Sequence, residues 1–267
     1  MSTVNAAFAQ TNPSFGEING NVEKAISLIE NTNFDLIVFP ELFNTGYAFT
    51  SKREAISLSE KIPDGSTCKK LMKFSSQKKN TIVAGLAELY GEKSYNSAVV
   101  VSNGKYIGRY RKLHLFNKEK LWFSPGNLRL KVYDLKTYRL GVMICFDWIF
   151  PEVARTLSLM GADIIAHPSN LVLPDYCQNT MFARAIENKV FTITANRVGE
   201  ERRGKEYFRY TGQSIIISPK MKCLASATNK EVVCKSAKLN ISLARNKKIT
   251  FLNDVLNDRR PKFYMLS

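Results

Sequence analysis

The sequence predicts an α/β protein in which two β-sheets are covered by helices. Short apolar runs typical of strands alternate with stretches of helical periodicity along almost the whole chain. Open sheets rarely exceed about ten strands, so we expect two sheets rather than one very wide sheet. Crossover helices indicate parallel strands, and a hairpin signal indicates antiparallel ones, so the sheets are predicted to be mixed.

The predicted elements follow in chain order. Strands are predicted at residues 4–10, 35–39, 81–86, 97–102, 106–110, 138–144, 163–166, 191–196, 212–218 and 231–239. Helices are predicted after Asn21, at residues 67–79, from Pro151 and at residues 178–189, and a basic segment ends the chain.

Local signals support the helices. Asn21 is predicted to cap the first helix, because apolar residues repeat after it at helical spacing: Val22, Ala25, Ile26 and Ile29. Pro151 suits the first turn of a helix, where its missing N–H has no partner to lose.

Two further signals support the strands. Residues 35–39 form a short apolar run that ends at Pro40, as expected for a buried strand. Asn103-Gly104, between two strand-like runs, is the strongest short signal for a hairpin.

The composition indicates one folded domain. The chain has 267 residues, is 45% hydrophobic and has a mean hydropathy of −0.19, and a chain of this size buries a large core. We expect residues 1–267 to form a single domain. Apolar runs approaching the ~20 residues of a membrane helix are lacking, which argues against a membrane protein. The N-terminus does not resemble a secretory signal, and five widely spaced cysteines favour free thiols in the cytoplasm.

A net charge of +16 raises the alternative of a polyanion-binding protein. The basic residues, however, are spread over the whole chain and accompany no nucleic-acid-binding motif. We interpret them as a solvated surface and expect no specific nucleic-acid partner.

The residue inventory excludes several chemistries. Two histidines and no C-x-x-C pair make a metal site improbable. Residues 199–206 nearly match a phosphate-binding loop, but Glu206 stands where the Ser or Thr for magnesium is needed. We interpret this stretch as a charged surface loop.

Three candidates remain, each at the end of a predicted strand. Cys145 lies between a buried strand and a helix, at the sheet edge where α/β proteins bind ligands, although a free cysteine often only fills a core. Glu41 follows a buried strand among apolar residues, where desolvation would make its carboxylate a stronger base; a solvated loop position is the alternative. Lys112 follows the hairpin and could stabilise an oxyanion or belong to the basic surface.

Together, the three segments resemble the signature segments of the nitrilase superfamily of carbon–nitrogen hydrolases. They read F-P-E-L-F-N-T-G-Y, Y-R-K-L-H-L-F and G-V-M-I-C-F-D-W-I-F-P-E. Glu41 and Lys112 are 71 residues apart, and Lys112 and Cys145 are 33 apart, in the order and at the usual separations of the family. The likeness continues through H-P-S-N, R-A-I-E-N and N-D-R-R-P, and so covers essentially the whole chain.

The resemblance implies a four-layer α-β-β-α sandwich that dimerises to an eight-layer core. It implies Cys145 as the nucleophile, Glu41 as its general base and Lys112 as the electrostatic stabiliser. Glu119 resembles the second carboxylate of many members, and the backbone N–H of Phe146 is expected to help hold the oxyanion. No metal or organic cofactor is implied.

Small amides, N-carbamoyl amines and nitriles all suit such a site. Phe-Asp-Trp follows Cys145, whereas nitrilases in the narrow sense more often have Trp-Glu there, so we favour an amidase or carbamoylase. Asn170, Tyr47 and residues 171–177 are candidates for the pocket wall. The alternatives are a nitrilase acting on small nitriles and a catalytically idle binding protein of the same fold.

Overall fold

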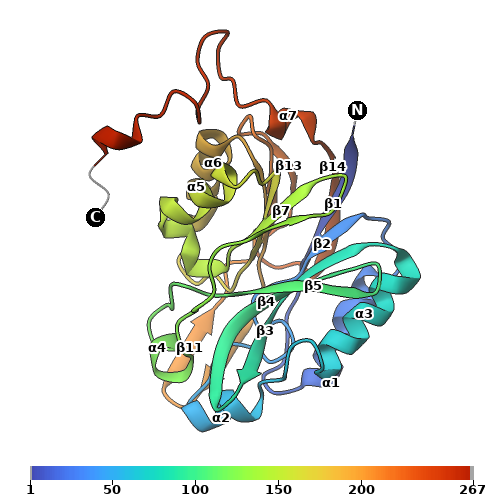
Figure 1. The fold of residues 1–267 in the computed structure, drawn as a ribbon. Coiled ribbons are helices and arrows are strands. Elements are labelled where there is room, and N and C mark those ends of the chain that lie inside the picture. The colour runs from blue at the N-terminus through green and yellow to red at the C-terminus, as the bar shows by residue number, and fades with distance from the viewer. Residues whose placement is uncertain (1, 265–267) are drawn as a thin grey trace.

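Two six-stranded mixed sheets form the centre of the molecule (Figure 1). The computed structural model describes residues 2–264. The first sheet has the strand order β14-β1-β2-β3-β4-β5. Its strands are β1 Thr3–Gln10, β2 Leu36–Val38, β3 Thr81–Tyr90, β4 Lys93–Ser102, β5 Lys105–Arg111 and β14 Val233–Asn240.

The second sheet has the order β13-β12-β9-β8-β7-β6. Its strands are β6 Val132–Asp134, β7 Arg139–Val142, β8 Ile164–Pro168, β9 Phe191–Ala195, β12 Ile215–Ile217 and β13 Cys223–Ser226. A separate hairpin pairs β10 Glu200–Arg203 with β11 Glu206–Arg209. The prediction of two mixed sheets is therefore confirmed.

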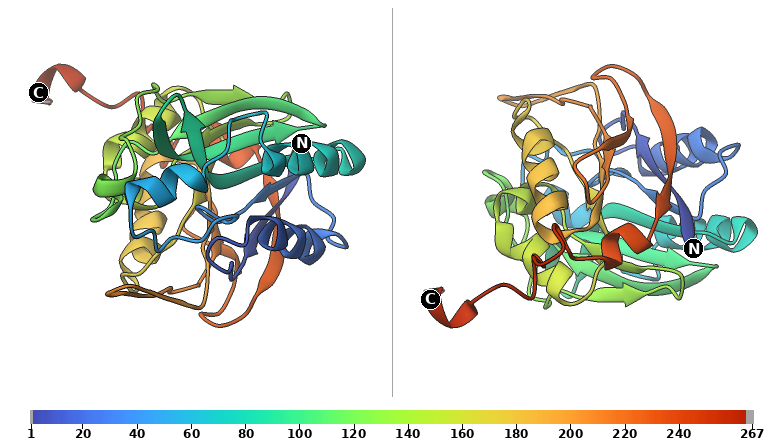
Figure 2. Two further views of the ribbon diagram at one scale, coloured as in Figure 1. Left: turned by 90° about the horizontal axis from the view of Figure 1, so that it is seen from below. Right: turned by 90° about the horizontal axis from the view of Figure 1, so that it is seen from above.

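Helices cover the outer face of each sheet, which gives the four layers (Figures 1 and 2). The first sheet contacts α1 Ile18–Ile29 and α3 Ser66–Lys78, and the second contacts α5 Pro151–Leu159 and α6 Tyr176–Asn188. The shorter helical segments are α2 Lys52–Ser57, α4 Glu119–Trp122, α7 Ser242–Arg245 and the 3₁₀ turns η1 Cys145–Ile149 and η2 Pro261–Phe263.

Strand alternation builds the core between the layers. In β1, Ala6 and Phe8 pack into the apolar layer shared with the second sheet, whereas Ala7 and Ala9 pack against α1 and α3. Both faces of β2 are also buried, with Leu36 and Val38 on one side and Ile37 on the other. A strand buried on both faces has no polar alternation, which is why residues 35–39 read as a continuous apolar run.

Most predicted elements are present, with boundaries shifted by a few residues. The Asn103-Gly104 turn is confirmed, and both residues have positive φ angles, 49° and 79°, as a two-residue hairpin turn requires. Pro151 begins α5 as predicted. The predicted cap at Asn21 is wrong, because α1 begins at Ile18. The Asn21 side chain instead donates to the carbonyl oxygens of Ser14 and Asn44 and ties α1 to two neighbouring loops.

Residues 199–206 are also more ordered than a surface loop. They contribute to the β10–β11 hairpin, and Glu201 is buried. Its carboxylate accepts hydrogen bonds from Arg197, Tyr210 and the backbone N–H of Tyr47. All four residues of β10 are charged, so no apolar residue marks its buried side. The sequence therefore did not reveal that Glu201 is buried.

Beyond α7 the chain forms a loop closed by a bridge between Lys248 and Asp254, and it then runs away from the sheets to η2 (Figure 2). Within residues 2–264, we find no helix that combines the length and apolar character needed to cross a membrane.

Candidate active site

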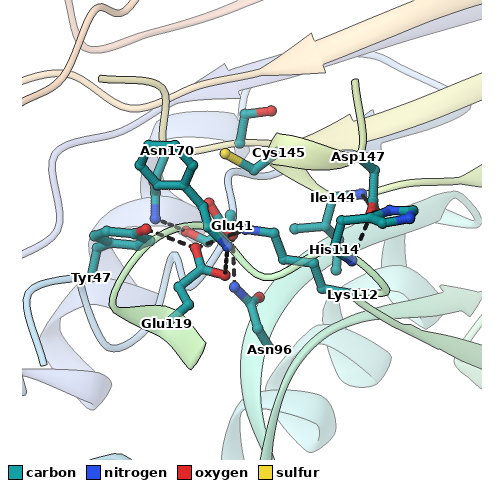
Figure 3. A network of polar contacts seen from close by, with 12 residues as sticks. Glu41, Tyr47, Asn96, Lys112, His114, Glu119, Ile144, Cys145, Asp147 and Asn170 are labelled. Atoms are coloured by element: carbon teal, nitrogen blue, oxygen red, sulfur yellow. Dashed lines mark hydrogen bonds and ion pairs between the residues drawn. The ribbon is translucent and has the colours of Figure 1, made fainter. Parts of the chain in front are cut away.

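The ends of strands from both sheets bring the candidate residues together (Figure 3). Glu41 lies three residues beyond β2, and Lys112 directly follows β5 of the same sheet. Cys145 lies three residues beyond β7, and Asn170 lies two beyond β8, both from the second sheet. The site therefore lies where the two sheets meet, and neither sheet could form it alone.

An ion-pair network links the charged groups of the site. The Lys112 ammonium lies 2.7 Å from Glu41 Oε1 and 2.7 Å from Glu119 Oε1. All three residues are at least 96% buried, with exposed fractions of 0%, 1% and 4% for Glu41, Lys112 and Glu119. Tyr47 donates its hydroxyl hydrogen to Glu119 Oε1 at 2.7 Å, and the Phe116 N–H donates to Glu119 Oε2 at 3.2 Å.

Glu41 is held firmly but keeps one oxygen free. Asn96 donates to Glu41 Oε1 at 2.7 Å, and Asn170 donates its amide hydrogen to the Glu41 backbone oxygen at 2.8 Å. Glu41 Oε2 is buried and has no hydrogen-bond partner among the described residues. An unpartnered buried carboxylate oxygen is costly for the fold, and it is the atom that can accept a proton from a reacting group.

Gly85 allows Glu41 to approach β3 closely. A Cβ atom at this position would lie 2.5 Å from Glu41 Cα and 2.8 Å from the Pro40 oxygen. The backbone bond from the Gly85 N–H to the Pro40 oxygen, 3.1 Å long, fixes the same approach. Sequence reasoning missed Gly85 and Asn96, because both belong to strands β3 and β4 that carry no motif of their own.

Cys145 has a strained backbone that the fold stabilises. Its φ angle is +41°, in the left-handed region that side chains other than glycine seldom adopt. His167 Nε2 lies 2.9 Å from the Cys145 carbonyl oxygen, and Thr194 Oγ1 lies 3.1 Å from His167 Nδ1. A carbonyl only accepts, so Nε2 carries the hydrogen and donates it. Sequence reasoning did not single out His167 as a site residue, although it begins the H-P-S-N segment.

Burial and neighbouring charges set the protonation states. Burial raises the pKa of Glu119 to about 7, although the Lys112 charge opposes the shift. Burial alone would lower the pKa of Lys112, but the charges of Glu119 and Glu41 outweigh it and raise that pKa above its ordinary value. Burial and then the Glu41 charge raise the pKa of the Cys145 thiol. Cys145 is therefore a thiol at rest and needs a base to become a nucleophile.

Burial also lowers the pKa of His167 to about 4. The imidazole is therefore neutral near pH 7, which agrees with its role as a donor to the Cys145 carbonyl.

The thiol faces a small pocket. Its wall includes Cys145, Asn170 and half-buried Phe146, together with Phe116, Trp148 and residues 171–173. Asn170 Oδ1 is a second buried acceptor with no partner in the part of the chain that the structure describes. Tyr47 and Glu119 line an adjoining pocket, which shares Phe116 with the first. Of residues 171–177, the last four do not line the Cys145 pocket: Pro174 and Asp175 line a separate pocket, Tyr176 begins α6 and is exposed, and Cys177 is buried in the core.

All the predicted site residues thus lie in one region: Glu41, Tyr47, Lys112, Glu119, Cys145, Phe146 and Asn170. Across residues 2–264, no group of three or more His, Cys, Asp or Glu side chains is arranged to hold a metal ion.

Comparisons with known proteins agree on one family. The family model described as "Carbon-nitrogen hydrolase" matches residues 5–246. A "Nitrilase" from Pyrococcus abyssi is 48% identical over 98% of this chain and 99% of its own. An "N-carbamoylputrescine amidase" from Solanum lycopersicum is 28% identical over 91% of this chain and 86% of its own. A Saccharomyces cerevisiae crystal structure, described as a member of branch 10 of the nitrilase superfamily, has a TM-score of 0.80 at 26% identity and covers 91% of this chain and 92% of its own.

Proposed function

Since this chain belongs to the carbon-nitrogen hydrolase family, we propose that it is a cysteine-dependent hydrolase of small amides or N-carbamoyl amines that releases ammonia. Family membership and the four-layer fold confirm the resemblance identified from the sequence. One observation carries the proposed chemistry. A buried thiol shares a site with a buried ammonium and with a carboxylate whose second oxygen has no partner among residues 2–264.

Acylation follows from this arrangement. Glu41 Oε2 takes the thiol proton as the Cys145 sulfur attacks the carbonyl carbon of the substrate. The Lys112 ammonium and the Phe146 N–H stabilise the oxyanion that forms. When the intermediate collapses, Glu41 returns its proton to the leaving nitrogen, and ammonia departs from a thioester.

Deacylation reuses the same groups. Ionised Glu41 takes a proton from water, and the hydroxide adds to the thioester carbon. Collapse of the second intermediate releases the acid, and the sulfur takes the proton back from Glu41. Throughout both half-reactions, Glu119 orients Lys112 through their ion pair. These steps require no cofactor.

The free acceptors of the site favour substrates that carry N–H groups. Glu41 Oε2 and Asn170 Oδ1 are both buried acceptors without partners within residues 2–264. An amide or a urea group can donate hydrogen bonds to them, whereas a nitrile has no N–H. A substrate that leaves these buried acceptors unpaired has a less well stabilised transition state.

Nitriles are the second candidate class. The 48%-identical relative from Pyrococcus abyssi is named "Nitrilase", and a thiol with an adjacent base can also add to a nitrile carbon. A substrate panel separates these classes.

The experiment is ammonia release from amides, N-carbamoyl amines and nitriles, with Cys145→Ala in parallel. We expect release from the first two classes that disappears in the variant. Release from nitriles alone would replace the proposal by the nitrilase alternative. Equal release by both proteins would contradict the role of Cys145, and no release by correctly folded wild-type protein would favour the binding-protein alternative.

We also propose a cytoplasmic homodimer. The five cysteines are free thiols, which supports a reducing compartment. The dimer rests on the family resemblance, and sedimentation equilibrium of the purified protein tests it.

A further inference from the structure

Asp147 is a buried carboxylate that collects four hydrogen bonds beside the active site (Figure 3). Its side chain is 0% exposed. Oδ2 accepts from the Tyr110 hydroxyl at 2.7 Å and from the Ile144 N–H at 2.8 Å. Oδ1 accepts from the His114 N–H at 3.2 Å and from His114 Nδ1 at 2.7 Å. Since a carboxylate only accepts, Nδ1 of His114 carries the hydrogen.

The donors come from the two segments that hold the reacting groups. Tyr110 and His114 stand two residues on either side of Lys112, whereas Ile144 immediately precedes Cys145. Tyr110 belongs to β5 of the first sheet, and Ile144 follows β7 of the second. The carboxylate therefore joins segments that share no sheet hydrogen bonds, at the point where both sheets contribute to the site.

We propose that Asp147 is a positioning residue that holds the Lys112 segment against the Cys145 turn. The inference rests on the proposed function, in which Lys112 must face the oxyanion formed on the Cys145 adduct. Hydrogen bonds to a carboxylate are strong and directional. Asp147 belongs to the Cys145 turn, so the three bonds from Tyr110 and His114 hold the Lys112 segment against this turn, and the bond from the Ile144 N–H fixes the carboxylate within it. Asp147 itself acts through Lys112 and Cys145 and touches no substrate.

Asp163, which immediately precedes β8 of the second sheet, provides a matched control. It is also buried, at 3% exposed, and accepts from the Arg139 N–H at 3.0 Å and from Arg245 at 3.2 Å. Asp163 precedes β8, whereas the site lies beyond its other end. A general loss of a buried carboxylate would affect stability in both variants, but only Asp147 bridges the catalytic segments.

The experiment compares Asp147→Asn with Asp163→Asn in kcat, KM and thermal unfolding. An Asn side chain has nearly the same size as Asp but replaces one acceptor oxygen by an NH₂ donor, which then faces the hydrogen-bond donors of the neighbouring segments. We expect kcat to fall roughly 100-fold in Asp147→Asn with KM little changed, because a displacement of about 1 Å at a reacting group costs that much. Asp163→Asn should keep kcat within about twofold, since distant sites act independently.

Tyr110→Phe keeps the inference testable if Asp147→Asn does not fold. This variant removes the hydroxyl that donates to Asp147 at 2.7 Å and accepts from the Leu113 N–H at 3.3 Å, both on the Lys112 side. We expect kcat to fall roughly fivefold, mainly through loss of the bond to the carboxylate. Added to Asp147→Asn, it should cost less than it does alone, because both act through the same carboxylate.

The rate of Cys145 alkylation by iodoacetamide separates this inference from the proposed function. Wild-type protein that hydrolyses no substrate would remove the function, and the alkylation rate would then decide the positioning role. Slower alkylation in Asp147→Asn than in Asp163→Asn supports that role. Equal rates, or an unchanged kcat in an active enzyme, overturn it.

Discussion

Arg111 and Lys112 are adjacent buried cations at the end of β5, but the carboxylates around them differ in how completely they are hydrogen-bonded. Arg111 donates to both oxygens of Glu88, at 3.0 and 2.5 Å, and to Asn127 at 2.7 Å. Its guanidinium also stacks 4.0 Å from the ring centroid of Tyr95. Lys112 contacts the Oε1 atoms of Glu41 and Glu119, and Glu41 Oε2 has no partner among the described residues.

We interpret the difference as that between a structural network and the proposed reactive one. Around Arg111, both oxygens of the carboxylate are satisfied, so the network stabilises the fold and has nothing left to offer a ligand. Around Lys112, two carboxylates share one cation, and one oxygen remains available. The incomplete network lowers the stability of the folded protein, and contacts elsewhere in the fold offset this loss.

The strongest way to test this contrast is Lys112→Met, which keeps the length of the side chain and removes the charge. We expect kcat to fall roughly 10³-fold, because loss of one oxyanion donor has effects of this size. Steady-state kinetics on the best amide of the panel measure it, with circular dichroism to verify folding. A fall of less than about tenfold would remove Lys112 from the stabilisation of the transition state.

Arg111→Met should show the opposite pattern. Removing the guanidinium leaves Glu88 buried with weaker compensation, so we expect the free energy of unfolding to fall by about 3 kcal/mol. In the remaining folded protein, kcat should stay within roughly threefold of wild type, because the two side chains share no hydrogen-bond or ion-pair partner among the described residues. Urea unfolding and kinetics on one preparation check both quantities. A large loss of kcat without loss of stability would show that the two networks are not separate.

Protonation of Glu119 should make stability depend on pH. Its pKa is raised from the ordinary value of 4.5 to about 7, so the folded protein binds this proton more tightly than the unfolded chain. The resulting stabilisation is complete below pH 4.5 and is lost as the pH rises through 7. The unfolding free energy of wild type relative to Glu119→Gln should therefore fall by up to about 3 kcal/mol across this window. A difference that stays constant with pH would contradict the raised pKa.

The smallest expected effect is that of Tyr47→Phe. The hydroxyl donates to Glu119 at 2.7 Å, and its loss should cost about 1 kcal/mol of stability and a few-fold of kcat. Tyr210→Phe is the matched control, because Tyr210 donates at 2.8 Å to Glu201, a carboxylate that binds the backbone N–H of Tyr47 but makes no hydrogen bond with its hydroxyl or with Glu119. Equal losses of kcat in both variants would show that the Tyr47 hydroxyl only stabilises the fold.

The sequence predicted the site residues that stand in motifs and missed those that lie inside strands. Glu41, Lys112 and Cys145 stand in motifs at strand ends, so their type and order identified them. Asn96 and Gly85 lie inside strands whose pattern explains only burial. Their contacts with Glu41, a 2.7 Å hydrogen bond and a close backbone approach, arise from strand pairing over long sequence distances.

The sequence by itself determined the layered α/β architecture, because hydrophobic periodicity and turn signals are local properties of the chain. It also determined the chemical types available: one thiol, two carboxylates and an ammonium in ordered motifs. Tertiary structure decided which Glu41 oxygen lacks a partner among the described residues, how Asp147 joins the Lys112 and Cys145 segments, and that Glu201 is buried rather than solvated. These properties depend on the meeting of two sheets from distant parts of the chain, where hydrogen bonding and desolvation are set by neighbours that no local pattern specifies.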